Sequence, residues 1–269
     1  MTTKTNEKTN KAKQTLVENV SRLLDSDTYK RALAFRKKFH NYSFSNMLLI
    51  FFQCPDAQLI AGYRKWQSLG RQVRKGERSI AIFGPMIRKV KEAKDGDRDK
   101  TECIGFRSLS VFDVSQTEGD AIPTTPTPKP LTGDSEAIQR ATAELTNFAL
   151  SKGWAVSFEA LAGPKGCWYP SEDRIAIESN ESPAQQLKTL IHEIGHAMFQ
   201  HGKPNDDTTA RVAELEAEST AFLTCDALGI DTGSYSFRYL AGWAGDPDNV
   251  LEAANRAAKV ADQIVEAIK

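Results

Sequence analysis

The sequence predicts an α+β protein of two domains. A stretch from Asp120 to Gly133, with four prolines and no hydrophobic periodicity, has the composition of an extended linker. Short helices and strands are expected before it, and a mainly helical region with a small antiparallel sheet after it. We therefore expect domains at residues 1–119 and 134–269, joined by a linker at 120–133.

The first half begins with helices and continues with strands. After a polar tip, the apolar residues between Leu16 and Leu24 recur at intervals of three and four, which indicates a helix, and a second helix is expected from about Thr28. Ser43 or Ser45 can cap a short buried helix that ends near Cys54. The remaining elements expected in this half are a short helix ending at Gly70 and strands at residues 79–83 and 103–114.

The second half is expected to carry its sheet between helices. An amphipathic helix at residues 135–152 precedes a strand at 156–160 and a hairpin whose turn is Ser171 to Asp173. Ser182 and Pro183 give a strong helix start, and the helix that follows runs to about Gln200. Further helices are expected from Asp206 to Gly229, at 235–243, and from Asp246 to the C-terminus.

The helix that follows Ser182 contains His192-Glu193-Ile194-Gly195-His196. In a helix, side chains four residues apart lie on one face, so both imidazoles can bind one cation, and Glu193 lies beside them as a candidate general base. The alternative is a helix that carries two histidines by chance. Three of the four histidines in the chain fall within ten residues, which favours a metal site, and two imidazoles with a carboxylate favour Zn²⁺.

A catalytic zinc site needs a third protein ligand, and the next helix offers three glutamates. Glu216, twenty residues after His196 and followed by Ala, resembles the third ligand of the thermolysin-like peptidases called gluzincins, and this resemblance implies the ligand role for Glu216. Glu214 and Glu218 point about 200° away from it, as hydrogen-bond partners of the ligands or as solvated charges. The segment can also be a plain acidic helix face. We expect His201 to be exposed to solvent.

Charge is distributed unevenly along a chain with no net charge. Residues 1–130 hold 24 Lys and Arg against 14 Asp and Glu, and the remainder holds 11 against 21. Basic side chains interleaved with aromatic rings suit single-stranded DNA, because the charges contact phosphates and the rings stack on bases. A basic half can also simply be soluble, and the aromatic residues can be core residues. The candidate DNA-binding residues are Tyr42, Phe44, Asn46, Arg64, Lys65, Trp66, Arg71, Arg74, Lys75 and Arg78.

Three segments of the first half resemble a known family. Asn41 to Leu49, Trp66 to Glu77 (which ends in Val-Arg-Lys-Gly-Glu) and Val111 to Gln116 look like the N-terminal domain of ArdC-type antirestriction proteins. The resemblance implies a single-stranded-DNA-binding domain at 1–119, followed by a gluzincin-like zinc metallopeptidase domain at 134–269. It also implies antirestriction activity during conjugative transfer.

Three functions fit these features. In the first, a zinc peptidase with Glu193 as its base is tethered to a DNA binder and cleaves an unidentified protein, which lies as an added strand along the hairpin. Its oxyanion donor would be Tyr169, Tyr235 or Tyr239, although each can instead be a packing residue. In the second, the protein is a DNA shield with structural zinc. In the third, it is a protease that cleaves DNA-bound or crosslinked proteins or repressors.

The remaining composition predicts a cytoplasmic protein. Four cysteines without any close pair argue against disulfides and thiolate zinc sites. The polar N-terminus has no apolar segment of the kind that directs secretion, and no run of residues approaches a membrane span in length. We therefore expect no membrane association.

Overall fold

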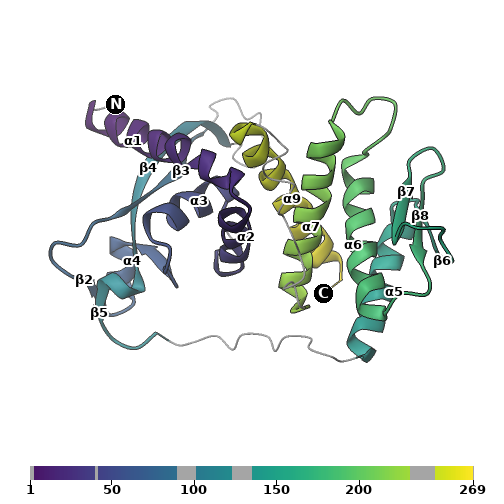
Figure 1. Cartoon of the computed structure of the whole chain (residues 1–269). Helices are drawn as coiled ribbons and strands as arrows, with labels where there is room; N and C mark the ends of the chain where they lie inside the picture. Colours follow the sequence, from purple (N-terminus) through teal and green to yellow (C-terminus); the bar gives the residue numbers. More distant parts are fainter. Residues whose placement is uncertain (1–2, 40–41, 90–100, 123–134, 231–245, 269) are drawn as a thin grey trace, which may run out of the picture. The chain divides into compact units, whose positions relative to one another are not determined.

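The computed structural model describes residues 3–39, 42–89, 101–122, 135–230 and 246–268, and Figure 1 shows the chain. These residues form two compact units. Unit 1 takes its described residues from Met1–Asn19 and Lys38–Thr125, and unit 2 from Val20–Lys37 and Pro126–Lys269. Mixed helices and small sheets confirm the α+β class. Most of the expected linker, and the helix expected at 235–243, lie outside the described residues.

Unit 1 contains a three-stranded antiparallel sheet in the order β1-β4-β3 and a separate antiparallel pair, β2 and β5. Three helices accompany these strands. The bounds are α1 (Thr3–Val20), α3 (Phe44–Gln53), β1 (Ile60–Gly62), α4 (Tyr63–Ser68), β2 (Arg71–Val73), β3 (Ile80–Lys89), β4 (Thr101–Asp113) and β5 (Thr117–Gly119), with the 3-10 turn η3 (Val114–Gln116). The 3-10 turn η2 (Arg36–Lys38) lies at the boundary between the two units in the sequence.

Helix α3 covers the free edge of β3. Asn46 exchanges two hydrogen bonds with the backbone of Phe83, at 2.8 and 2.7 Å. Gln53, two helical turns later, does the same with Ala81 at 2.9 and 3.0 Å. At Ala81 and Phe83 the edge of β3 is therefore closed to pairing with another chain.

The described residues of unit 2 form four long helices and a three-stranded sheet. The bounds are α5 (Ser135–Ser151), β6 (Ala155–Glu159), β7 (Gly166–Tyr169), β8 (Arg174–Glu178), α6 (Pro183–Phe199), α7 (Ala210–Leu228) and α9 (Pro247–Ala267). β7 and β8 form the predicted hairpin, but β6 pairs with β8 in parallel, so the sheet is mixed rather than antiparallel. Its order is β6-β8-β7, which leaves β7 at an edge. The sheet packs against α5 and α6 (Figure 1).

An N-terminal segment completes unit 2. The 3-10 turn η1 (Ser21–Leu24) and helix α2 (Ser26–Phe35) belong to this unit, although the sequence places them in the first domain. Tyr29 is fully buried, and its hydroxyl lies 2.7 Å from that of Ser219 on α7. Arg36 forms a 2.7 Å ion pair with Asp262 on α9. The helices of the second half therefore pack against residues that precede most of unit 1 in the chain.

None of the described helices is long and apolar enough to cross a membrane. The four cysteines are all free thiols.

Candidate metal centre

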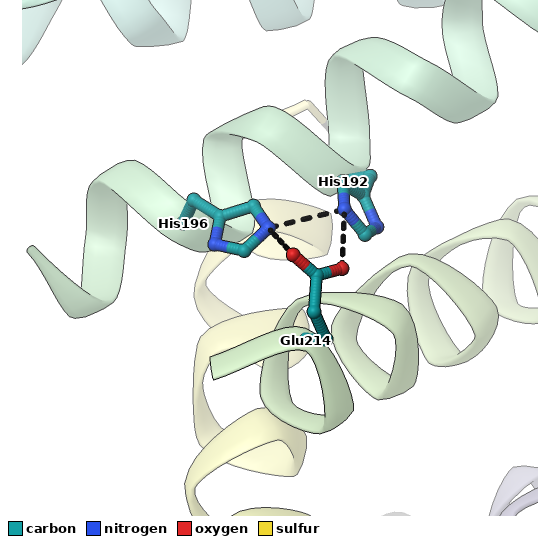
Figure 2. A group of neighbouring side chains, drawn as sticks. All are labelled: His192, His196 and Glu214. Carbon is teal, nitrogen blue, oxygen red and sulfur yellow. Dashed lines mark hydrogen bonds and ion pairs between the residues drawn. The ribbon is translucent and has the colours of Figure 1, made fainter. Parts of the chain in front are cut away.

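His192 and His196 converge on one point from α6. Their Nε2 atoms lie 3.1 Å apart, one helical turn from each other along the same face. Ser182 caps the helix and Pro183 occupies its first turn, as the sequence predicts. Figure 2 shows the two rings turned toward a single carboxylate.

That carboxylate belongs to Glu214 on α7. Its two oxygens lie 3.6 Å from Nε2 of His192 and of His196 respectively. Ligand atoms of these three residues all lie within 4.8 Å of one another. Such separations suit atoms that each lie about 2.0–2.2 Å from one cation. The donor set of two imidazoles and one carboxylate therefore fits a divalent metal.

The close contact of α6 with α7 explains why Glu214 faces the histidines. Gly195 packs so closely on α7 that a Cβ added there would lie 3.3 Å from Cα of Ala217. On α7, Glu214 and Glu218 share one helix face, whereas Glu216 points about 200° away from both. The contact side of α7 thus carries Glu214 and Glu218.

Glu216 does not lie beside the two histidines, where the ligand role expected for it would place it. Its side chain is 1% exposed and its Oε2 lies 2.9 Å from Nε2 of His201, away from the group formed by His192, His196 and Glu214. Arg256 of α9 lies 3.1 Å from the other oxygen. A buried carboxylate needs such partners, and here they hold Glu216 apart from the two histidines.

Each candidate ligand histidine has a partner at its other nitrogen. Nδ1 of His192 lies 3.1 Å from Glu218, one of the roles that the sequence left open for that residue. Nδ1 of His196 lies 2.9 Å from Nδ1 of His201. His201 is only 5% exposed, so the expectation that it faces solvent is wrong. Partners of this kind fix the orientation of metal-binding imidazoles.

Glu193 lies on α6 between the two histidines in sequence and is buried against β7. Burial raises the pKa of its carboxyl above the usual value, although the nearby His192 and the backbone N–H of Trp168 act in the opposite direction. A Cβ added to Gly166 would overlap with Cγ2 of Thr189 and would lie 3.0 Å from Oε1 of Glu193. Glycine at this position of β7 therefore makes room for both side chains.

Burial also affects the pKa of both histidines. It lowers the pKa of His196 to about 3, with help from the neighbouring His192 and His201, so this imidazole is neutral and has a lone pair for a metal. For His192 burial acts to lower the pKa, but the hydrogen bond that its ring donates to Glu218 and the charges of nearby carboxylates outweigh burial and raise the pKa.

A pocket of about 300 Å³ opens beside Glu193. Residues of α6, of β7 and its approach, and of α7 line it: Lys165, Gly166, Gln185, Lys188, Thr189, His192, Glu193 and Glu218. The edge strand β7 therefore passes both the candidate base and a cavity that can accept a side chain.

Of the expected oxyanion donors, only Tyr169 lies in the described residues; Tyr235 and Tyr239 lie outside them. The guanidinium of Arg174 stands 4.2 Å from the centre of the Tyr169 ring. A hydrogen bond with Cys167 raises the pKa of Tyr169. These contacts give Tyr169 a packing role on the hairpin.

Five of the expected DNA-binding residues have structural partners in unit 1. Phe44 and Trp66 are 2% and 0% exposed, so neither ring can stack on a base. Asn46 is bonded to β3, as described above. Arg71 bonds to the Thr117 hydroxyl at 2.8 Å and to backbone oxygens of β5. Arg74 pairs with Glu77 at 2.7 Å.

The other expected DNA-binding residues are accessible. Tyr42 is half-buried, and the exposed basic residues are Arg64, Lys65, Lys75 and Arg78. The sequence reasoning did not single out an exposed apolar group on the hairpin of β3 and β4. There Phe106, Ile87 and Ile104 are 60%, 63% and 48% exposed.

Two family models match the chain. Residues 5–112 match the N-terminal domain of anti-restriction factor ArdC, and residues 140–230 match the IrrE N-terminal-like domain of the M78 peptidase family. The second match covers His192, His196 and Glu214. The second half of the chain is therefore similar to the IrrE-like domain of the M78 peptidase family.

The chain is also similar to individual proteins. An uncharacterised protein of Bacillus anthracis is 23% identical over 254 residues, which cover 81% of this chain and 43% of that protein. An uncharacterised protein of Sinorhizobium fredii is 27% identical over 221 residues, which cover 74% of this chain and 68% of the relative. The chain thus spans less than half the length of the Bacillus protein.

Two crystal structures of the antirestriction protein ArdC from the R388 plasmid have a similar fold. The metal-free structure gives a TM-score of 0.54 at 21% identity, with 84% of each chain covered. The Mn(II)-bound structure gives 0.56 at 20% identity, with 94% of this chain and 97% of that chain covered.

Proposed function

We propose that this chain, whose halves match the N-terminal domain of anti-restriction factor ArdC and the IrrE-like domain of the M78 peptidase family, is an antirestriction protein. It protects incoming plasmid DNA from restriction in the cytoplasm of the host. In this proposal unit 1 binds single-stranded DNA and unit 2 is a metal-dependent peptidase. The observation that carries it is the convergence of His192, His196 and Glu214 beside the buried Glu193.

We assign the metal to His192, His196 and Glu214, with Glu214 in the role that the gluzincin resemblance gave to Glu216. Zinc suits two imidazoles and one carboxylate. Manganese is the competing ion, because the similar ArdC structure is Mn(II)-bound. Three protein ligands leave a position open, which favours a catalytic site over the structural zinc of a pure DNA shield.

Held by His192, His196 and Glu214, a divalent metal would supply a Lewis acid that polarises a peptide carbonyl and lowers the pKa of water. Glu193 takes the proton of the attacking water and passes it to the leaving amine, a role that suits a carboxyl whose pKa is raised by burial. The backbone N–H of Trp168 holds this carboxylate in place.

Substrate binding is assigned to the edge strand β7, beside the N–H of Trp168 that Glu193 occupies. An extended segment of a protein substrate adds to this edge by main-chain hydrogen bonds and so lies beside Glu193. The side chain next to the scissile bond enters the 300 Å³ pocket. Thr189 and Gln185 offer polar contacts on its wall.

DNA binding is assigned to exposed side chains of unit 1. Arg64, Lys65, Lys75 and Arg78 contact phosphates, and Tyr42 stacks on a base. The exposed ring of Phe106 is a further candidate for stacking. We withdraw Phe44, Asn46, Trp66, Arg71 and Arg74 from this surface, because the fold uses their side chains.

The test uses the full chain, purified with and without metal. Zinc-loaded protein should cleave an unfolded protein such as casein, and Glu193→Gln should keep its metal and lose cleavage. Single-stranded DNA is added in a parallel set, because a protease of DNA-bound proteins should need DNA in the reaction. Cleavage by Glu193→Gln at the wild-type rate would remove Glu193 from the mechanism. Tight DNA binding without any cleavage would leave the shield as the function.

A further inference from the structure

A buried chain of polar side chains leads away from the metal centre. It runs from His196 on α6 to His201, then to Glu216 on α7 and Arg256 on α9. Successive contacts are 2.9 Å between the two Nδ1 atoms, 2.9 Å from His201 to Glu216, and 3.1 Å from Glu216 to Arg256. We propose that His201 is a positioning residue, an imidazole bridge through which Glu216 holds His196 in the tautomer and orientation that bind the metal. The inference rests on the metal site of the proposed function and does not need the peptidase activity.

The protons along this chain have one consistent arrangement. A metal at Nε2 of His196 requires a lone pair there, so the proton of that ring is on Nδ1 and is donated to Nδ1 of His201. The proton of His201 is then on Nε2 and is donated to the Glu216 carboxylate. The reverse arrangement would point a lone pair of His201 at a carboxylate and a proton of His196 at the metal. The metal at His196 and the carboxylate of Glu216 therefore select the same tautomers of the two histidines.

The backbone around His201 fixes the bridge. Gln200 adopts the left-handed conformation that ends α6, at φ 60°, and the N–H of His201 bonds back to the carbonyl of His196 at 3.0 Å. This turn brings His201 back beside the ring of His196 instead of continuing along the helix face. The carbonyl of His201 accepts a 3.0 Å hydrogen bond from the indole of Trp168.

Ring contacts also hold His201 and Arg256 in place. Phe199 stacks on His201, with ring centres 5.3 Å apart and planes at 25°. The guanidinium of Arg256 stands 5.0 Å from the centre of the same Phe199 ring. Since His201 and Glu216 are 5% and 1% exposed, water does not compete for these contacts. The two ligand histidines thus differ: His192 meets a carboxylate directly, and His196 meets one through a second imidazole.

The experiment measures Zn²⁺ affinity of the full-length protein by competition with a chelating indicator, and the visible spectrum of the Co²⁺ form. His201→Leu should weaken Zn²⁺ binding about 10- to 100-fold. His201→Gln should bind more tightly than His201→Leu, because its amide can accept from His196 and donate to Glu216. Both variants should keep the spectrum of a site with unchanged direct ligands.

The matched control is Thr224→Val, a nearly isosteric change at a buried residue of α7 whose hydroxyl makes no hydrogen bond among the described residues. It should bind Zn²⁺ as wild type does. Wild-type affinity in His201→Leu, or no recovery in His201→Gln, would overturn the inference, and so would an equal loss in Thr224→Val. A wild-type protein that binds no metal would instead contradict the proposed function.

Discussion

Replacing Arg256 by Met tests whether Glu216 is held as a buried charge. The aliphatic part of Met preserves packing on Phe199, while the change removes the cation that lies 3.1 Å from Glu216. The contact is an ion pair rather than a hydrogen bond, because Oε1 of Glu216 accepts no hydrogen bond among the described residues. Glu216 would keep only His201 as a partner for its carboxylate.

The expected cost follows from the burial of the two partners. Removing one partner of a buried ion pair costs about 3–5 kcal/mol. Arg256 is 40% exposed, and the contact with His201 remains, so we expect the lower figure of about 2–3 kcal/mol. At about 2–4 °C per kcal/mol for a domain of this size, the melting temperature of unit 2 should fall by roughly 4–12 °C.

The assay is urea unfolding of the metal-free protein, with the charge of Glu216 removed in a second variant. Glu216→Gln in the Arg256→Met background should recover about 1 kcal/mol or more, because a neutral amide still accepts from His201 and no longer buries a charge. Lys165→Ala is the control. It breaks an ion pair with Glu181 whose partners are 55% and 32% exposed, and it should cost less than about 1 kcal/mol. A loss in Arg256→Met no larger than in the control, or no recovery in the double variant, would refute this reasoning.

Three further predictions concern the base, an acid-sensitive turn and the DNA surface. Glu193→Gln should retain metal and lower cleavage at least about 100-fold, as measured by metal analysis and peptide hydrolysis; an unchanged rate would contradict it. Burial acts against ionisation of Asp206, but hydrogen bonds from Thr208 and Gly202 lower the pKa of its carboxyl to about 2. The ionised carboxylate stabilises the turn after His201, and this stabilisation is complete above pH 3.8, the pKa in the unfolded chain. It is lost as the pH falls through about 2. Asp206→Asn should therefore flatten the fall in stability over that pH range in fluorescence-monitored unfolding, and an unchanged profile would count against this. Replacing the exposed residues Arg64, Lys65, Lys75 and Arg78 together by Gln should weaken binding to single-stranded DNA. The slope of log affinity against log salt concentration should fall in magnitude by up to about 3, whereas an unchanged slope would place the DNA elsewhere.

Local sequence signals predicted the elements of unit 2 well. The capped helix with two histidines on one face and the hairpin at β7 and β8 both occur as expected, because short-range hydrogen bonds and side-chain periodicity determine them. The start of α7 was less well predicted: Thr209 caps it, not Asp206 or Asp207. Caps a few residues apart compete, and the turn held by Asp206 takes that residue.

The choice among the glutamates could not be read from the sequence. Their spacing shows that Glu216 points away from Glu214 and Glu218, but not which side of α7 meets α6. The contact between Gly195 and Ala217 decides that, and it joins elements far apart in the chain. His201 was misplaced for a related reason: the sequence indicated that the helix ends near Gln200, but not that the left-handed conformation of Gln200 turns the backbone so that His201 is buried.

In unit 1 the side chains suggested DNA contacts by their chemistry, but the sequence did not show which of them are buried. Trp66 and Phe44 look suited to stacking on bases, but they fill the core, and the Trp66 indole bonds to the carbonyl of Phe112 at 2.9 Å. The spacing of Asn46 and Gln53 over two helical turns was a signal for pairing with a strand edge. No local pattern indicated that residues 20–37 pack with the second half.

The most direct test of the metal centre is a crystal structure of the zinc-loaded protein with anomalous diffraction at the zinc edge. We expect one peak about 2.0–2.2 Å from Nε2 of His192, Nε2 of His196 and an oxygen of Glu214, with Glu216 still paired to His201 and Arg256. A peak bonded to Glu216, or one that lies away from the two histidines, would contradict it.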